Sequence, residues 1–224
     1  ALSSAASDVY KRQRQFRSDV GYGNSISIHV TLVPYLGTSG ELKTKPSQHS
    51  VSVLRSYGIQ PEILVCRTSK PIPKKEKEKL ALFCSVDPEA VIECKDMKSI
   101  YEVPLALEAQ GIAQVALKRL QLLDKKPNLD SWIKLVENIK NPTKTFKVAI
   151  AGKYTKLSDA YISVVESLKH AGYLHNAQID IKWIASEECV DYEKAKEAMK
   201  DVDGLVVVSY THLRAHEPCA DLVC

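Results

Sequence analysis

Short apolar runs alternate with charged, helix-forming segments along the middle of the chain, and this alternation most strongly limits its fold. Residues 62–66 (EILVC) and 90–94 (AVIEC) are nearly continuous apolar runs of strand length, typical of strands buried on both faces of a parallel sheet. Residues 25–33 (SISIHVTLV) alternate and are rich in β-branched side chains, which also predicts a strand. Helices are predicted over residues 74–84 and 100–122. Strands that alternate with helices predict an α/β fold with a parallel sheet.

A second strand-and-helix series follows after a change of composition. Residues 124–145 contain two prolines and many Lys and Asn residues, and we interpret them as an interdomain linker that holds a short helix around residues 132–139. Strands are then predicted over residues 146–151, 177–184 and 204–207, with helices over residues 158–171 and 192–200. The chain therefore has the organisation of two α/β domains.

Composition excludes several classes of protein. With 45% hydrophobic and 26% charged residues, the 224-residue chain has the make-up of a soluble globular protein rather than a disordered one. The net charge of +4 is too small to indicate nucleic-acid binding, although a local basic cluster could still bind a small anion. There is no apolar run of membrane-spanning length and no signal peptide, so we expect a cytoplasmic protein with no membrane or nucleic-acid partner.

The cysteines and the chain ends carry no predicted chemistry. None of the six Cys residues forms a C-x-x-C pair, which favours buried, reduced thiols over a metal or redox site. Residues 1–13 and 208–224 show neither helical nor strand periodicity and resemble translated adapter sequence, so we expect both to be non-native tails. The alternative for these ends is a genuine disordered tail. The native piece would then be residues 14–207, a fragment cut at both ends.

A basic segment, residues 40–50 (GELKTKPSQHS), is the best local indication of a ligand. Lys43 and Lys45 are two residues apart, so both point to one side of an extended segment. Pro46 fixes its own φ, and a helix with Ser47 as candidate N-cap follows at once. Two ammonium groups beside exposed helix N–H groups can bind a phosphate, but solvated loop lysines are the commoner outcome of such a pattern.

Six consecutive stretches resemble the CTP synthase family in order and spacing. They are HVTLVPYL, KTKPSQHS, LRSYGIQPEILVCR, LALFC, SIYEVPLALEAQG and VAIAGKYTKLSDAYISVVESLKHAG. The resemblance implies a Rossmann-like, P-loop-type amidoligase domain with a partial parallel sheet, followed by the start of a class I glutamine amidotransferase α/β domain. By this likeness, residues 14–123 are the C-terminal half of the amidoligase domain, residues 124–145 the linker, and residues 146–207 the start of the glutaminase domain.

The resemblance also assigns binding residues. The family's pyrimidine-nucleotide segment KTKPTQ falls on Lys43, Thr44, Lys45, Pro46, Ser47 and Gln48, with Ser47 in place of Thr, and a family lysine that contacts UTP or CTP falls on Lys79. Arg67, Lys95, Asp96 and Met97 correspond to residues around ATP, with Met97 in place of the commoner Val. From the residues alone, Lys79 would be a lysine on a solvated helix face and Arg67 a member of a surface ion pair.

The resemblance implies an enzyme that uses ATP, Mg²⁺ and glutamine-derived ammonia to convert UTP to CTP, with GTP as an effector and a homotetramer as the assembly. No catalytic residue and no metal ligand of the family falls in this sequence, so we expect the chain itself to be inactive. The alternatives are a non-catalytic module that binds UTP or CTP for regulation, and an unrelated flavodoxin-like binding domain.

Overall fold

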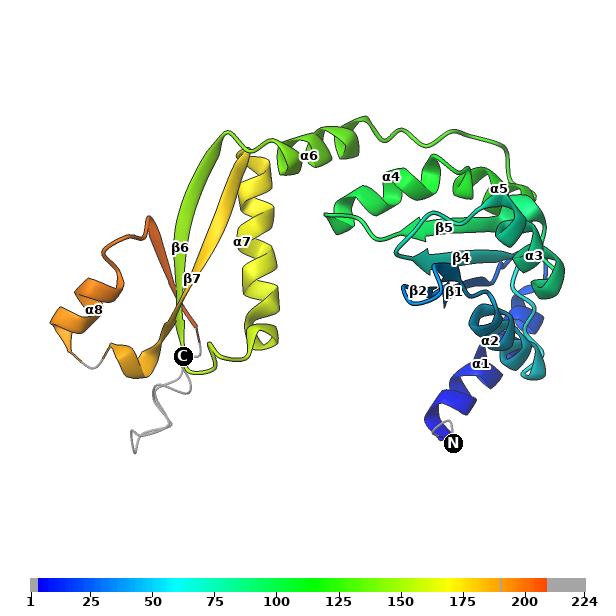
Figure 1. Ribbon diagram of the computed structural model, residues 1–224, viewed down its shortest axis with the longest axis horizontal. Helices are drawn as coiled ribbons and strands as arrows, with labels where there is room; N and C mark the ends of the chain where they lie inside the picture. The colour runs from blue at the N-terminus through cyan, green and yellow to red at the C-terminus, as the bar shows by residue number, and fades with distance from the viewer. Residues whose placement is uncertain (1–3, 190, 209–224) are drawn as a thin grey trace. The chain divides into compact units, whose positions relative to one another are not determined.

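The computed structural model describes residues 4–189 and 191–208, which form two compact units divided between Leu129 and Asp130 (Figure 1). The division falls inside the segment expected to be a linker. Among the described residues, none of the helices has the length and apolar character that a bilayer crossing demands.

The first unit is built on a three-stranded parallel sheet. Its strand order is β1-β4-β5, and the central strand β4 is buried at five of its six residues. The helices and strands of this unit are α1 (Ser4–Val20), β1 (Ile28–Leu32), β2 (Tyr35–Leu36), β3 (Glu41–Leu42), α2 (Lys45–Ser56), β4 (Ile63–Thr68), α3 (Lys74–Cys84), η1 (Pro88–Ala90), β5 (Val91–Lys95), η2 (Ile100–Glu102), α4 (Val103–Glu108) and α5 (Ile112–Arg119).

Helices cover both faces of this sheet, which gives the doubly wound, Rossmann-like arrangement expected from the sequence. On one face, Val51 of α2 and Leu80 of α3 pack against Leu64 and other alternate residues of β4 and β5. On the other face, Val115 of α5 packs against Ile63 and its neighbours, with α4 beside it. Two separate apolar cores therefore hold the sheet from its two sides.

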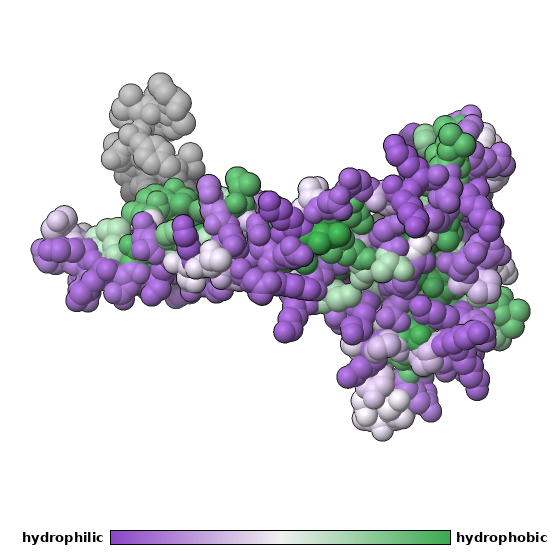
Figure 2. Space-filling view, turned by 90° about the horizontal axis from the view of Figure 1, so that it is seen from above, coloured by the Kyte–Doolittle hydropathy of each residue, from purple (hydrophilic) through white to green (hydrophobic). Residues whose placement is uncertain are grey.

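Hydrophobic side chains also reach the surface. Figure 2 shows hydrophobic patches between the hydrophilic areas that cover most of this view. The exposed residues include Ile28, Val30 and Leu32, which alternate along β1 and are 45%, 61% and 59% exposed. They share one face of the sheet with Ile63 and Val65, which are buried. This face is thus covered over β4 and solvent-exposed along β1.

The N-terminal segment corrects one expectation. Residues 1–13 were expected to lack regular structure, but α1 begins at Ser4 and runs to Val20. Arg17 on this helix donates a 2.5 Å hydrogen bond to Glu62, whose other carboxylate oxygen accepts from the Ser27 backbone N–H at 2.6 Å. Both side chains are largely buried, so the pair fixes where the C-terminal half of α1 lies against the sheet.

The second unit is also a parallel α/β layer. Its sheet has the order β7-β6-β8, and α7 packs along β7. Its elements are α6 (Asp130–Lys140), β6 (Lys144–Gly152), η3 (Ser158–Tyr161), α7 (Ile162–Leu174), β7 (Ala177–Ala185), η4 (Ser186–Glu188), α8 (Tyr192–Ala198) and β8 (Gly204–Val207). A Cβ atom on Gly172 would lie 2.7 Å from the Ala177 carbonyl oxygen, so glycine permits this close approach. The helix predicted over residues 158–171 begins later, because a 3-10 turn precedes α7 and Tyr161 occupies its N-cap position.

Candidate nucleotide-binding sites

The carboxyl ends of three parallel strands meet at one edge of the first sheet. Leu32 of β1 pairs with Arg67 of β4, and Arg67 pairs with Cys94 of β5, so the loops that follow these strands begin at one level. Open α/β sheets bind their ligands at this edge. Two pockets lie there, and between them they are lined by most of the residues that the sequence singled out.

The first pocket, which we call the lysine pocket, has a volume of about 690 Å³. Its walls come from the β2–β3 hairpin, the segment that leads into α2, the loop after β4 and the exposed side of α3. The lining residues are Tyr35, Gly40, Glu41, Leu42, Lys43, Thr44, Lys45, Lys70, Pro71, Pro73, Glu76 and Lys79. The pocket therefore brings together Lys43, Lys45 and Lys79, which are up to 36 positions apart in the sequence.

A tight hairpin places the first of these lysines. The Leu36 carbonyl oxygen accepts from the Gly40 N–H at 2.8 Å. Gly40 has a φ of +66°, which residues with a Cβ atom rarely adopt. Strand β3 then brings Lys43 back beside Pro34, and the Lys43 N–H donates to the Pro34 carbonyl oxygen at 2.9 Å. Pro46 lies in the first turn of α2 and follows Lys45 directly, where its fixed φ suits a helix start.

Positive charge dominates the lysine pocket. Four lysines line it against two glutamates, and one of these glutamates, Glu41, accepts a 2.5 Å hydrogen bond from Lys43. This hydrogen bond and the charge of Lys43 lower the pKa of the Glu41 carboxyl. The remaining cations leave a surplus of two positive charges in a partly enclosed, polar space, which suits a phosphate-bearing ligand.

The other members of the predicted segment take structural positions. Ser47 was expected to cap α2, but Thr44 occupies the N-cap position, and the fully buried Ser47 donates its hydroxyl hydrogen to the Leu32 carbonyl oxygen at 2.8 Å. Gln48 lies one turn after Thr44, and its side-chain amide donates to the Thr44 hydroxyl at 3.1 Å. Of the six residues, Lys43, Thr44 and Lys45 line the pocket, whereas Pro46, Ser47 and Gln48 do not.

The second pocket, which we call the arginine pocket, has a volume of about 400 Å³ at the ends of β4 and β5. All four residues assigned to ATP line it, together with Cys94, Ile100 and Val103; the four are Arg67, Lys95, Asp96 and Met97. Arg67 donates to the Asp96 carboxylate at 3.0 Å, and the Asp96 N–H continues the sheet by donating to the Thr68 carbonyl oxygen at 2.9 Å.

The arginine pocket combines polar and apolar walls. Its guanidinium and ammonium groups can bind a phosphate or a sugar hydroxyl, and the Met97 side chain offers an apolar surface beside them. The side chains of Arg67 and Asp96 are each about half exposed, so their ion pair contributes at most about 1 kcal/mol to stability. A ligand can therefore break this ion pair at little cost in free energy.

Sequence reasoning missed five lining residues of the lysine pocket, which are Tyr35, Lys70, Pro71, Pro73 and Glu76. Lys70 had a usable signal, because it lies two residues after the buried strand β4, at the edge where open α/β sheets bind ligands. Tyr35 had no such signal, since the loop between β1 and α2 gave no indication of a hairpin.

Comparison with known proteins identifies the family of this chain. A model of the CTP synthase N-terminus matches residues 5–122. The chain belongs to the CTP synthase family. It is 50% identical over 194 residues to the CTP synthase of Geobacillus kaustophilus and 50% identical over 199 residues to that of Methanocaldococcus jannaschii. These alignments cover 87% of this chain but only 36% and 37% of the relatives, so the chain spans about a third of their length.

Family membership excludes the unrelated flavodoxin-like domain that the sequence had left open. The match begins at residue 5, inside the segment interpreted as adapter-like, so the proposed non-native origin of residues 1–13 stays a prediction. The other expected tail lies outside the described residues, apart from Val208, whose N–H donates to the Ala151 carbonyl oxygen at 2.9 Å.

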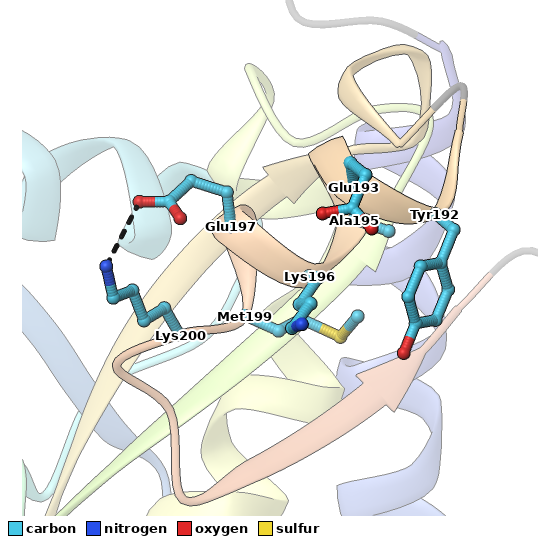
Figure 3. A pocket seen from close by; sticks show the side chains of 7 residues that line it. All are labelled: Tyr192, Glu193, Ala195, Lys196, Glu197, Met199 and Lys200. Carbon is cyan, nitrogen blue, oxygen red and sulfur yellow. Dashed lines mark ion pairs between the residues drawn. The ribbon is translucent and has the colours of Figure 1, made fainter.

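Among the residues that the structure describes, the other candidate groups form no further site of this kind. In the part of the chain that the structure describes, no three His, Cys, Asp or Glu side chains gather closely enough to hold a metal ion. His29 is half buried and its Nε2 lies 2.8 Å from the Ser50 hydroxyl, which agrees with a structural rather than a ligand role. A hollow in the second unit lies on the short helix α8, where Lys196 and Met199 lie near Tyr192 and Glu197 pairs with Lys200 (Figure 3).

Proposed function

We propose that this chain is the nucleotide-binding part of an enzyme that converts UTP to CTP with ATP and ammonia from glutamine. The observation that carries the proposal is the lysine pocket, where Lys43, Lys45 and Lys79 meet at the carboxyl edge of the sheet. Membership of the CTP synthase family supports UTP or CTP as the phosphate-bearing ligand. The intact protein would then be a cytoplasmic enzyme of pyrimidine biosynthesis, assembled as a homotetramer.

Each pocket has its own nucleotide in this proposal. The lysine pocket binds the triphosphate of UTP, or of CTP as an inhibitor, because ammonium groups form charge-assisted hydrogen bonds with phosphate oxygens. The arginine pocket binds ATP, with Arg67 toward the phosphates and Met97 against the base. Both pockets lie on one sheet edge, which suits a reaction in which ATP phosphorylates UTP and ammonia then displaces the phosphate.

The second unit is, in this proposal, the start of the glutaminase domain, and GTP acts near it as an effector. Two observations support this. The alignments to the relatives cover 87% of the chain, which is more than the whole first unit, so they extend into the second unit. The GKYTK stretch of the resemblance, residues 152–156, also begins at the last residue of β6 and continues into the loop that follows. In this loop the Tyr154 N–H donates to the Tyr161 hydroxyl at 3.1 Å.

We infer that the chain alone is catalytically inactive. Phosphoryl transfer to UTP requires Mg²⁺ to stabilise the phosphate charge. The described residues do not form a site for this ion: among them, Asp96 is the only carboxylate that lines the arginine pocket, and it is paired with Arg67. The magnesium ligands and both catalytic centres would come from other parts of the parent enzyme.

A regulatory module that binds UTP or CTP without chemistry is the second candidate, because the lysine pocket would serve it equally well. The sequence of the complete gene separates the two candidates. A phosphate-binding glycine loop upstream and a nucleophilic cysteine elbow downstream would establish the enzyme. A complete gene without either would establish the regulatory module.

The experiment that tests the lysine pocket is Lys45→Ala, with UTP and CTP binding measured on the chain by titration. We expect both affinities to fall together by about ten- to hundred-fold, because a hydrogen bond to a charged group contributes about 1.5–3 kcal/mol. Lys75→Ala removes the same charge from α3 outside the pocket and is the matched control. An unchanged UTP affinity in Lys45→Ala would contradict the assignment.

A further inference from the structure

The geometry points to Lys70 as an additional phosphate-binding residue of the lysine pocket, one that the family resemblance does not assign. This inference rests on the proposed function, because it takes the ligand to be a nucleoside triphosphate. Lys70 reaches the pocket from the loop after β4, whereas Lys43 and Lys45 come from the start of α2 and the residues just before it, and Lys79 comes from α3. It therefore adds a cation from a third direction.

The loop that carries Lys70 is held by hydrogen bonds on both sides of this residue. The buried Thr68 hydroxyl donates to the Lys70 carbonyl oxygen at 2.8 Å and accepts from the Lys70 N–H at 3.3 Å. Two residues on, the Ile72 N–H donates to the Glu93 carboxylate of β5 at 2.6 Å, and the Ile72 side chain is buried. The backbone at Lys70 is therefore fixed before any ligand arrives, which lowers the entropy lost on binding.

The Lys70 side chain is directed toward the hairpin side of the pocket. Its ammonium nitrogen lies 5.9 Å from the centre of the Tyr35 ring, and Tyr35 lines the same pocket. An exposed ammonium over a tyrosine face is only weakly attracted, so a phosphate can draw it away. Among the described residues, no carboxylate lies within ion-pair range of Lys70, unlike Lys43, which Glu41 already engages.

Charge matching favours the same role. A nucleoside triphosphate carries several negative charges, and without Lys70 the pocket offers three lysines against two glutamates. Lys70 raises the surplus from one positive charge to two. Ammonium groups bind phosphate as point charges and need no fixed fork geometry, so a lysine on a fixed loop is a suitable residue for this contact.

Lysine protection tests the inference directly on the 224-residue chain. The chain is treated with an amine-acetylating reagent, and the rate at each lysine is read by mass spectrometry with UTP, inorganic triphosphate, uridine or no addition. We expect UTP and triphosphate to slow acetylation of Lys70 together with Lys45 and Lys79, and uridine to leave these rates unchanged. Lys75 is the internal control and should react at one rate throughout.

The possible outcomes separate the inference from the proposed function. Slower acetylation of Lys45 with an unchanged rate at Lys70 would overturn the role of Lys70 and leave the proposed function standing. Unchanged rates at both residues in saturating UTP would overturn both.

A binding titration gives a second, independent measurement. Lys70→Ala should weaken UTP binding by about three- to tenfold, because solvent screens the contact between an exposed ammonium group and a phosphate, and Lys70→Arg should retain most of the affinity. Lys75→Ala should bind UTP like the unsubstituted chain. A UTP affinity in Lys70→Ala equal to that in Lys75→Ala would contradict the contact.

Discussion

At the scale of single residues, burial decides the chemistry of the cysteines. The sequence predicted reduced, buried thiols. Cys66 and Cys84 are free and fully buried between β4 and α3, whereas Cys94 and Cys189 are free but only partly buried. Burial raises the pKa of the Cys66 thiol from 9.0 to about 12 and also raises that of Cys84. These thiols therefore remain protonated in the folded protein and act as small apolar side chains.

The raised pKa of Cys66 predicts a loss of stability in alkali. In the unfolded chain the thiol ionises near pH 9, whereas in the folded chain it ionises only near pH 12, so its contribution is complete below pH 9 and is lost as pH rises toward 12. Between pH 8 and pH 10 the free energy of unfolding should fall by roughly 1 kcal/mol through this group. Denaturant unfolding at the two pH values measures the effect.

Cys66→Ala is the matched control for that measurement. It should be less stable at both pH values because it leaves a cavity, but its loss of stability between pH 8 and pH 10 should be smaller than that of the unsubstituted chain. An equal pH dependence in the two proteins would show that Cys66 does not titrate in this way.

Single polar residues were the least predictable part of the site. Ser47 has a hydroxyl in the right place in the sequence to cap α2 or contact a phosphate, but the helix begins two residues earlier and turns that hydroxyl toward the Leu32 carbonyl oxygen. Local sequence does not specify this choice, because the competing partner lies fifteen residues away and is brought close only by the sheet.

At the scale of elements, most of the fold followed from apolar periodicity. Helix α3 has the predicted bounds, and β4 and β5 lie where the apolar runs indicated, because strands buried on both faces must be apolar throughout. The β2–β3 hairpin was missed, since each strand has only two residues and no alternation can be read from so short a segment. That hairpin supplies Tyr35 and the turn before Lys43, so missing it also hid part of the lysine pocket.

The connection between the two units predicts where a protease cuts first. The sequence placed the accessible segment over residues 124–145, but α6 fills much of that range and packs against α7. Residues 121–128 precede α6, are exposed and contain no helix or strand, so they offer the extended backbone that proteases require.

Limited trypsin digestion tests this placement. Cleavage after Lys125 should precede cleavage after Lys134 or Lys140, which are the matched sites inside α6, and it should release two fragments that each resist further digestion. Earlier cleavage inside α3, for example after Lys77, would contradict the boundary between the units.

At the scale of the whole molecule, the sequence predicted the charged residues that line the two pockets better than the other segments that enclose them. Arg67 and the Lys95–Met97 loop were expected near one nucleotide and do line one pocket, because the ends of adjacent parallel strands must meet. Lys79 could be joined to Lys43 and Lys45 only through the family resemblance, since no periodicity relates a helix face to a loop 34 residues earlier. The first sheet also leaves an apolar row exposed along β1.

The central claim is that this chain carries nucleotide-binding residues of a CTP-forming enzyme but lacks the catalytic centres. The most direct measurement is CTP formation by a hybrid in which residues 14–207 replace the matching segment of the Geobacillus kaustophilus CTP synthase, with UTP, ATP, Mg²⁺ and glutamine supplied. We expect the hybrid to form CTP, and the 224-residue chain alone to form neither CTP nor glutamate above a no-protein control. A folded hybrid that forms no CTP, or product formed by the chain alone, would contradict the claim.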